Sequence, residues 1–333
     1  MEREQILKVD NLKKWFPAKT GLFPHSHTYV KAVDGVSFEI TKGEIFGIVG
    51  ESGCGKTTIA RVILRLTDKT AGAVSFKGQD IFALEKSRIR EMRRSMQMIF
   101  QNPYEILEAR LTVLQLLSEP LEFHGMGGTT AEKKEKASQI LLDVDIAPPE
   151  QFLLKHPFEL SGGQLQRIAI ARALILQPEF IVADEPVSML DVSIRAGILE
   201  LLSELRRDRG LSYVIITHDL AVARFVCDRL AVMYMGRIVE VGPSDKVLGQ
   251  PLHPYTKALR AVLPTLTFNR KHYRDVSTVI RGEISSPTEI PPGCSFHTRC
   301  PFAKERCSTE EPRLRRLGEN RFVSCHFVEE ISL

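Results

Sequence analysis

The chain has 333 residues, with 45 Lys and Arg against 41 Asp and Glu and a net charge of +4. This length allows a large core and about two domains, and the scattered, nearly balanced charges argue against a nucleic-acid-binding surface. The start MEREQILKVD has three charges in its first four residues and no apolar segment typical of a secretory signal. Apolar runs such as YVIIT are far shorter than the roughly 18 residues that span a bilayer. We therefore expect a soluble chain on the cytosolic side.

The N-terminal part predicts sheet. Residues 7–12, 29–40 and 44–50 have the alternating or β-branched character of strands, and the turn pair Lys42-Gly43 separates the last two. From about residue 111 the apolar spacing becomes helical and is broken by glycine and proline. This change predicts a helical subdomain over about 102–172.

Strand patterns return in the second half of the chain, at FIVAD, YVIIT, RLAVMYM and RIVEVG. Between the first two, apolar residues at spacings of three and four predict an amphipathic helix. Buried strands alternating with such helices favour an α/β fold with a largely parallel sheet. Beyond about Gly249 the sequence becomes rich in proline and basic residues. We therefore expect one domain over 1–250 and a small extension over 251–333.

A phosphate-binding loop is predicted where GIVGESGCGKTT follows a strand and precedes a helix, in the pattern G-x-x-x-x-G-K-[ST]. Glycines let consecutive N–H groups point at phosphate oxygens, and the helix adds its positive end. Lys56 would neutralise phosphate charge, and the Thr57 hydroxyl would bind Mg²⁺. The predicted phosphate-binding residues are Ser52, Gly53, Cys54, Gly55, Lys56, Thr57 and Thr58.

Two later strands end in polar residues suited to the same chemistry. EFIVADEP places Asp184 and Glu185 after four apolar residues. Asp184 would hold the magnesium through water, and Glu185 would act as general base on the attacking water. His218, at the end of YVIITHD, is predicted to reach the same edge of a parallel sheet.

The segment LSGGQLQR at 160–167 predicts a second anion-binding helix end, with a serine cap and two glycines. One nucleotide seldom needs two such cradles from one subunit. The pattern therefore favours nucleotides that bind between two chains.

Taken together, these motifs resemble those of the ATP-binding subunits of ABC transporters. GESGCGKTT is similar to the Walker A loop, FQNP to the Q-loop, LSGGQ to the signature, IVADE to Walker B, SMLD to the D-loop and THD to the switch. The resemblance covers about 5–250. It implies a P-loop NTPase of the ABC ATPase type with a helical subdomain, followed by the small C-terminal cysteine-containing extension.

The resemblance also implies roles at the ATP site. Two subunits would form a head-to-tail sandwich, with the signature of one at the γ-phosphate held by the other. Gln101 would bind Mg²⁺ and sense the γ-phosphate, and Asp191 would link the two sites. An aromatic residue would stack on adenine, with Phe16 as the first choice and Trp15 as the second. The signature residues assigned to the nucleotide are Ser161, Gly162, Gly163 and Gln164.

The subfamily is indicated by HPYTKALRAVLP followed by PPGCSFHTRCP, which is similar to the C-terminal extension of dipeptide and oligopeptide importer subunits. Nickel and oligosaccharide importers share it, so the cargo stays open. The implied partners are a second, paralogous ATPase subunit, two transmembrane permeases and an extracytoplasmic binding protein. The implied location is the cytoplasmic face of the cell membrane, and the implied activity is ATP hydrolysis coupled to import.

Other ABC ATPases fit less well. DNA-repair types insert very long coiled coils before the signature, whereas 111 positions separate Gly50 from Ser161 and no heptad run is sustained. A cassette that binds ATP without hydrolysing it is disfavoured because Gln101, Glu185 and His218 are all present.

Four cysteines gather near the C-terminus, with five, six and seventeen residues between them. A reducing cytosol disfavours disulfides. Structural zinc usually shows closer pairs, and an iron–sulfur cluster tolerates wider spacing, so spacing decides weakly between them. The resemblance favours a [4Fe-4S] cluster with zinc as the second choice, and His297 and His326 as neighbours. The predicted ligands are Cys294, Cys300, Cys307 and Cys325.

Overall fold

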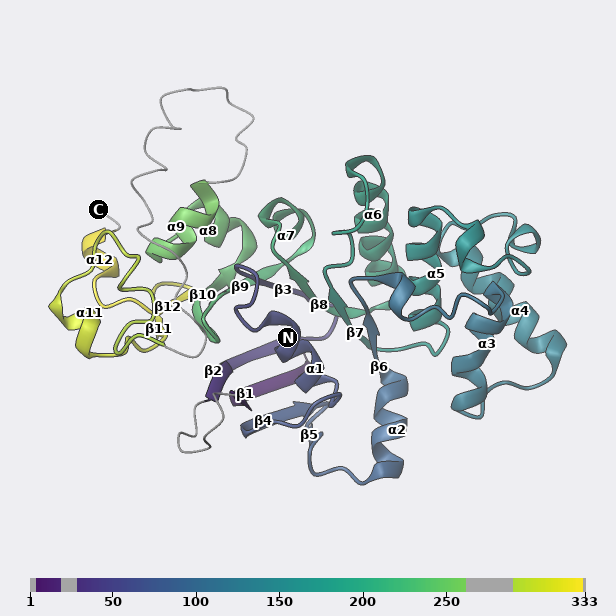
Figure 1. The fold of residues 1–333 in the computed structure, drawn as a ribbon, viewed down its shortest axis with the longest axis horizontal. Coiled ribbons are helices and arrows are strands. Elements are labelled where there is room, and N and C mark those ends of the chain that lie inside the picture. The colour runs from purple at the N-terminus through teal and green to yellow at the C-terminus, as the bar shows by residue number, and fades with distance from the viewer. Residues whose placement is uncertain (1–3, 19–28, 262–289, 332–333) are drawn as a thin grey trace. The chain divides into compact units, whose positions relative to one another are not determined.

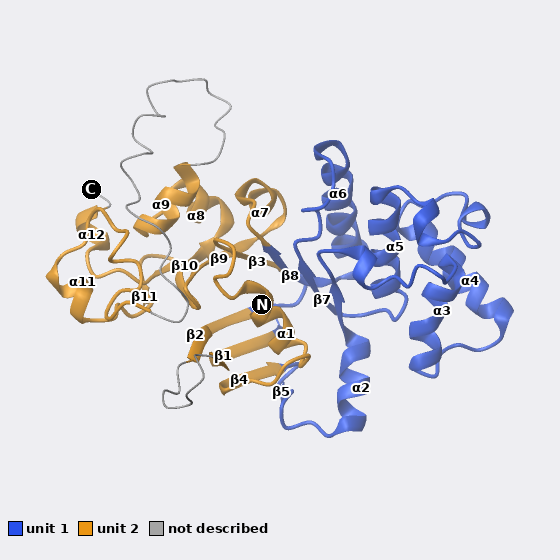
Figure 2. Cartoon of the chain, viewed as in Figure 1, with its two compact units in different colours: residues 1–6, 40–44, 76–216 blue, residues 7–39, 45–75, 217–333 orange. Residues whose placement is uncertain are grey.

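The computed structural model describes residues 4–18, 29–261 and 290–331, and the chain divides into two compact units (Figures 1 and 2). Unit 1 contains residues 1–6, 40–44 and 76–216, and unit 2 contains residues 7–39, 45–75 and 217–333. Part of the predicted extension, 262–289, lies outside the described residues. In the described ranges, no helix is long and apolar enough to cross a membrane.

Unit 1 is built on three parallel strands with β7 between β6 and β8. Every residue of β7 is buried, as expected for a strand covered on both faces. Helices α3, α4 and α5 pack side by side in this unit (Figure 1). Its elements are β5 (Gln79–Asp80), α2 (Lys86–Ser95), β6 (Met96–Ile99), η1 (Pro103–Glu105), α3 (Val113–Phe123), α4 (Thr130–Asp143), η2 (Pro149–Gln151), η3 (Pro157–Glu159), α5 (Gly162–Leu174), β7 (Phe180–Asp184), α6 (Val192–Arg209) and β8 (Ser212–Thr217).

Capping boxes begin the three helices of that group. Thr112 caps α3 and Thr129 caps α4, each bonding the backbone three residues later while Gln115 or Glu132 returns the bond. Each box satisfies N–H groups that the first helical turn leaves without a helical acceptor. These polar pairs therefore set where the helices of the subdomain begin.

Unit 2 holds two sheets. In one, β1 lies between β2 and β4; in the other the order is β11-β12-β10-β9-β3, with β3 parallel to β9. The elements of this unit are β1 (Gln5–Pro17), β2 (Tyr29–Thr41), β3 (Ile45–Val49), α1 (Lys56–Ile63), β4 (Ala71–Phe76), α7 (Leu220–Val226), β9 (Arg229–Tyr234), β10 (Arg237–Pro243), α8 (Ser244–Gly249), α9 (Pro254–Ala261), α11 (Glu305–Thr309), β11 (Arg315–Arg316), β12 (Phe322–Val323) and α12 (Val328–Ile331).

The strands β9 and β10 form an antiparallel hairpin, whereas the pairs β3–β9, β6–β7 and β7–β8 are parallel, in agreement with the largely parallel sheet that the sequence predicts. Their turn consists of Met235 and Gly236, both with positive φ (43° and 79°). Two such residues close a tight hairpin, whereas a parallel connection needs a dozen residues or more.

Candidate active site

The phosphate-binding loop runs from β3 to α1 in unit 2, and its shape depends on glycine at two positions. Gly50 has φ +157° and Gly55 has φ +107°. A Cβ on Gly50 would overlap the Met233 carbonyl oxygen, and one on Gly55 would overlap that of Ala32. The loop is therefore pressed against backbone on its inner side, and only glycine fits there.

Lys56 is folded into this loop and is only 6% exposed. Its Nζ donates to the carbonyl oxygens of Gly50 (2.8 Å) and Glu51 (2.9 Å). Carbonyl dipoles compensate a buried ammonium only partly, so an anionic phosphate fits this cradle. Other predicted phosphate-binding residues are accessible to a ligand: Ser52, Gly53 and Thr57 are exposed, and Thr58 is half-buried.

Cys54, inside the loop, is buried, and burial raises the pKa of its thiol although Lys56 lies beside it. The thiol is therefore protonated and unsuited to nucleophilic chemistry. Cys54 contributes a backbone hydrogen bond: its carbonyl oxygen accepts from the Gly236 N–H at 2.9 Å. That bond joins the loop to the β9–β10 turn.

Unit 1 brings Gln101 and Glu185 together, although 84 positions separate them. The Gln101 Nε2 donates to the Glu185 carboxylate at 2.9 Å. Glu185 has φ +48°, a region that non-glycine residues seldom occupy, and its N–H donates to Ile216 at 2.8 Å. Such strain persists where surrounding contacts hold it, and it is frequent at functional sites. Asp184, one residue earlier, ends β7 and is only 4% exposed.

The signature segment begins α5 in unit 1. Ser161 is its N-cap: the serine hydroxyl accepts from the Gln164 N–H (3.3 Å), and the Gln164 side chain accepts from the Ser161 N–H (3.0 Å). Ser161 and Gly162 are exposed, whereas Gly163 is buried, and a Cβ on it would lie 2.8 Å from Ile194 Cγ2.

The D-loop residue Asp191 is the N-cap residue of α6 and is exposed. Gly162 faces Leu190, and Gly163 faces Ile194, so the structure packs the signature against the start of α6. The two predicted sandwich-facing segments are therefore one surface of unit 1.

His218 belongs to unit 2, where it follows β8 and is exposed. The next residue, Asp219, caps α7 by accepting from the Ala221 N–H at 2.8 Å. His218 is thereby placed in a rigid turn between a buried strand and a helix.

The two candidate adenine-stacking residues lie near the end of β1 and differ in their surroundings. Trp15 donates from Nε1 to Asp34 at 3.2 Å, and the ammonium of Lys31 lies 5.0 Å from its ring centroid. The Phe16 ring is 38% exposed, with the Lys14 ammonium 4.7 Å from its centroid. Phe16 offers the freer ring and stays the predicted one.

The [4Fe-4S] prediction is wrong. Within the described ranges, no three or more His, Cys, Asp or Glu side chains form a group able to hold a metal ion. The four terminal cysteines do line one cavity, but its volume is about 20 Å³, room for about one water. Burial raises the pKa of Cys294 to about 12 and that of Cys300 to about 11, so both thiols are protonated in this structure. The zinc alternative fails on the same finding.

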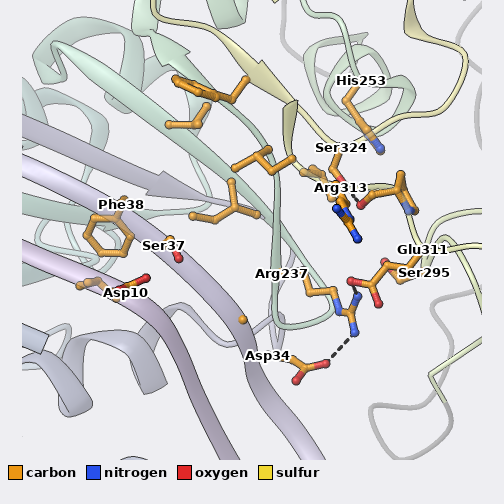
Figure 3. A pocket seen from close by; sticks show the side chains of 18 of the residues that line it. Asp10, Asp34, Ser37, Phe38, Arg237, His253, Ser295, Glu311, Arg313 and Ser324 are labelled. Carbon is orange, nitrogen blue, oxygen red and sulfur yellow. Dashed lines mark hydrogen bonds and ion pairs between the residues drawn. The ribbon is translucent and has the colours of Figure 1, made fainter. Parts of the chain in front are cut away.

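A larger cavity of about 670 Å³ lies in unit 2, between β1, β2, β10 and the segment that follows Cys294 (Figure 3). Arg237 donates to Asp34 at 2.7 Å and also contacts Glu311. The Asp34 N–H in turn donates to Gly236. No local sequence pattern predicts this network, because it joins residues up to 277 positions apart, from Asp34 to Glu311.

These loops, their helix ends and the carboxylate with its glutamine partner define a nucleotide-hydrolysing ATP-binding cassette. Comparison with known proteins agrees. The model of the family described as ABC transporter matches residues 33–188, and that described as "Oligopeptide/dipeptide transporter, C-terminal region" matches 239–307. The chain belongs to the ABC transporter ATP-binding proteins, in the oligopeptide/dipeptide branch.

Curated relatives extend over nearly the whole chain. The oligopeptide transport ATP-binding protein AppF of Bacillus subtilis (strain 168) is 46% identical over 325 residues, 97% of this chain and 98% of the relative. A probable peptide ABC transporter ATP-binding protein, y4tS, of Sinorhizobium fredii is 44% identical, covering 97% of this chain and 90% of the relative.

Solved structures give the same fold. The dimeric ATP-binding cassette MJ0796 in a post-hydrolysis state with ADP and Pi is 32% identical, with a TM-score of 0.63, covering 72% of this chain and 99% of that one. The cbiO1 protein of Clostridium perfringens is 27% identical with a TM-score of 0.64, covering 74% and 92%. The chain is therefore an ABC ATPase.

Proposed function

We propose that the chain powers the import of di- or oligopeptides by hydrolysing ATP on the cytoplasmic face of a membrane. The observation that carries the cargo class is the 46% identity to an oligopeptide transport protein, which includes the extension as well as the cassette. Its partners would be two permease subunits, an extracytoplasmic binding protein and a second, paralogous ATPase subunit.

In this mechanism the phosphate-binding loop holds the β- and γ-phosphates of ATP, with Lys56 turning from the loop carbonyls to the phosphate oxygens. Thr57 and Gln101 would bind Mg²⁺, and Asp184 would hold it through water; the ion supplies charge neutralisation on the phosphates. Phe16 would stack on the adenine.

Glu185 would accept a proton from the attacking water. The hydrogen bond from Gln101 orients its carboxylate, and the strained backbone at Glu185 fixes the direction of the side chain. His218 would hold the γ-phosphate oxygen from the switch turn. Ser161, Gly162 and Gly163 of the second subunit would close the site, with Asp191 as the link between the two sites.

Glu185→Gln tests the assigned base. Since the amide keeps the shape and loses the proton acceptor, turnover should fall by about 10² to 10⁴. ATP binding should persist, and size-exclusion chromatography with Mg²⁺ and ATP should show an accumulated dimer. A variant with normal turnover contradicts the role. Asp208→Asn on the exposed surface of α6 is the matched control and should leave turnover unchanged.

The cargo is tested with the complete importer in proteoliposomes. Peptides of two to five residues should raise ATP hydrolysis several-fold above the basal rate. Stimulation by nickel or by an oligosaccharide, with no response to peptides, would overturn the proposed cargo and leave the ATPase assignment intact.

A further inference from the structure

Three contacts converge on Glu51, the second residue of the phosphate-binding loop. Its carbonyl oxygen accepts from Lys56 at 2.9 Å. Its N–H donates to the Tyr255 hydroxyl at 3.0 Å. Its carboxylate receives both terminal nitrogens of Arg299, at 3.0 and 3.3 Å. Two of these three partners come from beyond residue 250, so the loop is held largely by the extension.

The partners are themselves held firmly. Arg299 is only 7% exposed, and its guanidinium also donates to the Tyr234 hydroxyl at 3.4 Å. A forked, two-bond ion pair fixes both distance and angle, and the pair is shielded from solvent on the arginine side. Unlike a surface ion pair, this one is able to set the conformation of the loop.

An aromatic cluster fixes the segment that carries Arg299. Phe296 is 1% exposed and lies edge-on to Tyr234, with ring centroids 5.3 Å apart. Its centroid is 5.5 Å from that of Tyr255, and the Tyr234 and Tyr255 centroids are 4.7 Å apart. Because these rings are buried together, a shift of the segment around Phe296 displaces both hydroxyl and guanidinium at Glu51.

We propose that the extension holds the phosphate-binding loop in its nucleotide-binding shape through Glu51, with Arg299 and Tyr255 as positioning residues. The extension thereby sets the affinity for ATP. If Glu51 swings away, the backbone of the loop loses the shape in which its N–H groups and Lys56 can reach the phosphates. This inference concerns ATP binding alone and stands or falls independently of the cargo.

The test is a double-mutant cycle on the full chain, with the dissociation constant of a fluorescent ATP analogue as the readout. Arg299→Met and Glu51→Gln should each weaken binding about tenfold, a typical coupling between sites. The double variant should be no weaker than either single variant, since both remove the same ion pair. Tyr255→Phe, which keeps the ring and loses the acceptor, should weaken binding about threefold.

Arg306→Met is the matched control. It removes the same charge from the same extension and breaks the exposed Arg306–Glu310 pair, so binding should change less than twofold. In steady-state assays the KM for ATP should rise in Arg299→Met while kcat stays within twofold. A purely structural role would lower the active fraction, and hence kcat, at unchanged KM.

Unchanged affinity in folded Arg299→Met, or single effects that multiply in the double variant, would overturn the proposal. If Arg299→Met does not fold, Arg299→Lys serves instead, because it keeps the charge and loses the fork. It should weaken binding about threefold, and wild-type affinity in that variant would refute the inference.

Discussion

The chain has two glycine-bearing helix starts that are predicted to meet phosphate, and they are built in opposite ways. Helix α1 begins after Gly55, in the left-handed region, with no side-chain cap among the described residues. Helix α5 begins after Ser161 with a complete capping box. The first helix end leaves N–H groups for a ligand, whereas the second satisfies its own.

The difference in capping predicts which helix end binds nucleotide first. The loop before α1 has a buried lysine and a backbone pressed into place, so its shape exists before the ligand arrives. The start of α5 is stable without ligand and has an exposed serine to offer. A preformed cradle binds tightly because little order has to be imposed. We therefore expect α1 to set affinity and α5 to contribute on closure of the dimer.

One methyl group added at each helix start should affect nucleotide binding very differently. Gly55→Ala would meet the Ala32 carbonyl, which cannot move without its strand, in a backbone region unfavourable to alanine. Nucleotide binding should fall by about 5- to 150-fold, which corresponds to strain of about 1–3 kcal/mol. Gly163→Ala would meet only an Ile194 methyl and should leave nucleotide affinity within about twofold. Isothermal titration with ATP measures both, and equal losses would refute the contrast.

Low pH should destabilise the chain through a buried histidine near the phosphate-binding loop, and not through the start of α5. His253 is 2% exposed, and burial lowers its pKa to about 3, while its ring accepts from the Tyr255 N–H at 3.1 Å. A histidine with a folded pKa below its unfolded value leaves stability intact above about pH 6.5 and costs stability as the pH falls below that value. From pH 6.5 to pH 4.5 the free energy of unfolding should fall by about 2 to 3 kcal/mol.

In His253→Gln, the free energy of unfolding measured by urea titration should depend much less on pH between pH 4.5 and pH 6.5. The capping box at the start of α5 contains no titrating group, so Ser161 variants should lose stability at low pH as the wild type does. If His253→Gln loses stability at low pH as the wild type does, a group other than His253 causes the acid sensitivity.

The smallest expected effect concerns the cap itself. Ser161→Ala removes the hydroxyl that accepts from the Gln164 N–H and should lower the free energy of unfolding by about 1 kcal/mol. Ser161→Asp restores an acceptor and should regain most of it, as thermal unfolding will show. If Ser161→Ala lowers nucleotide affinity in the monomer, the start of α5 contributes to affinity before the dimer closes, which contradicts the role assigned to it.

Local patterns made much of the fold readable from sequence. The strand before Gly50, the apolar run before Asp184 and the capping pairs of α3 to α5 follow from short-range spacing. Long-range partners are different. Local motifs predict Gln101 and Glu185 for one site but not the bond that joins them across 84 positions, and no local pattern marks the Arg299–Glu51 pair, which crosses 248 positions.

The cysteine error has the same origin. Spacing and resemblance brought the four thiols together, and the structure does set them around one cavity. What spacing cannot convey is the small volume and apolar lining of that cavity, which depend on neighbours such as Phe296, Phe302 and Phe327. The arrangement of the side chains and the volume between them, and not the number of cysteines in the sequence, decide whether a cluster fits.

The short strands of the extension have one more consequence, for solubility. In β12, Val323 pairs with Glu240 and Phe322 with Val241, so β12 covers the edge of β10 that would otherwise present unpaired backbone. The outermost strand, β11, is two residues long and consists of exposed Arg315 and Arg316. A short, charged edge discourages pairing with another sheet. Removing the extension would therefore expose the unpaired backbone edge of β10, and the truncated chain should aggregate.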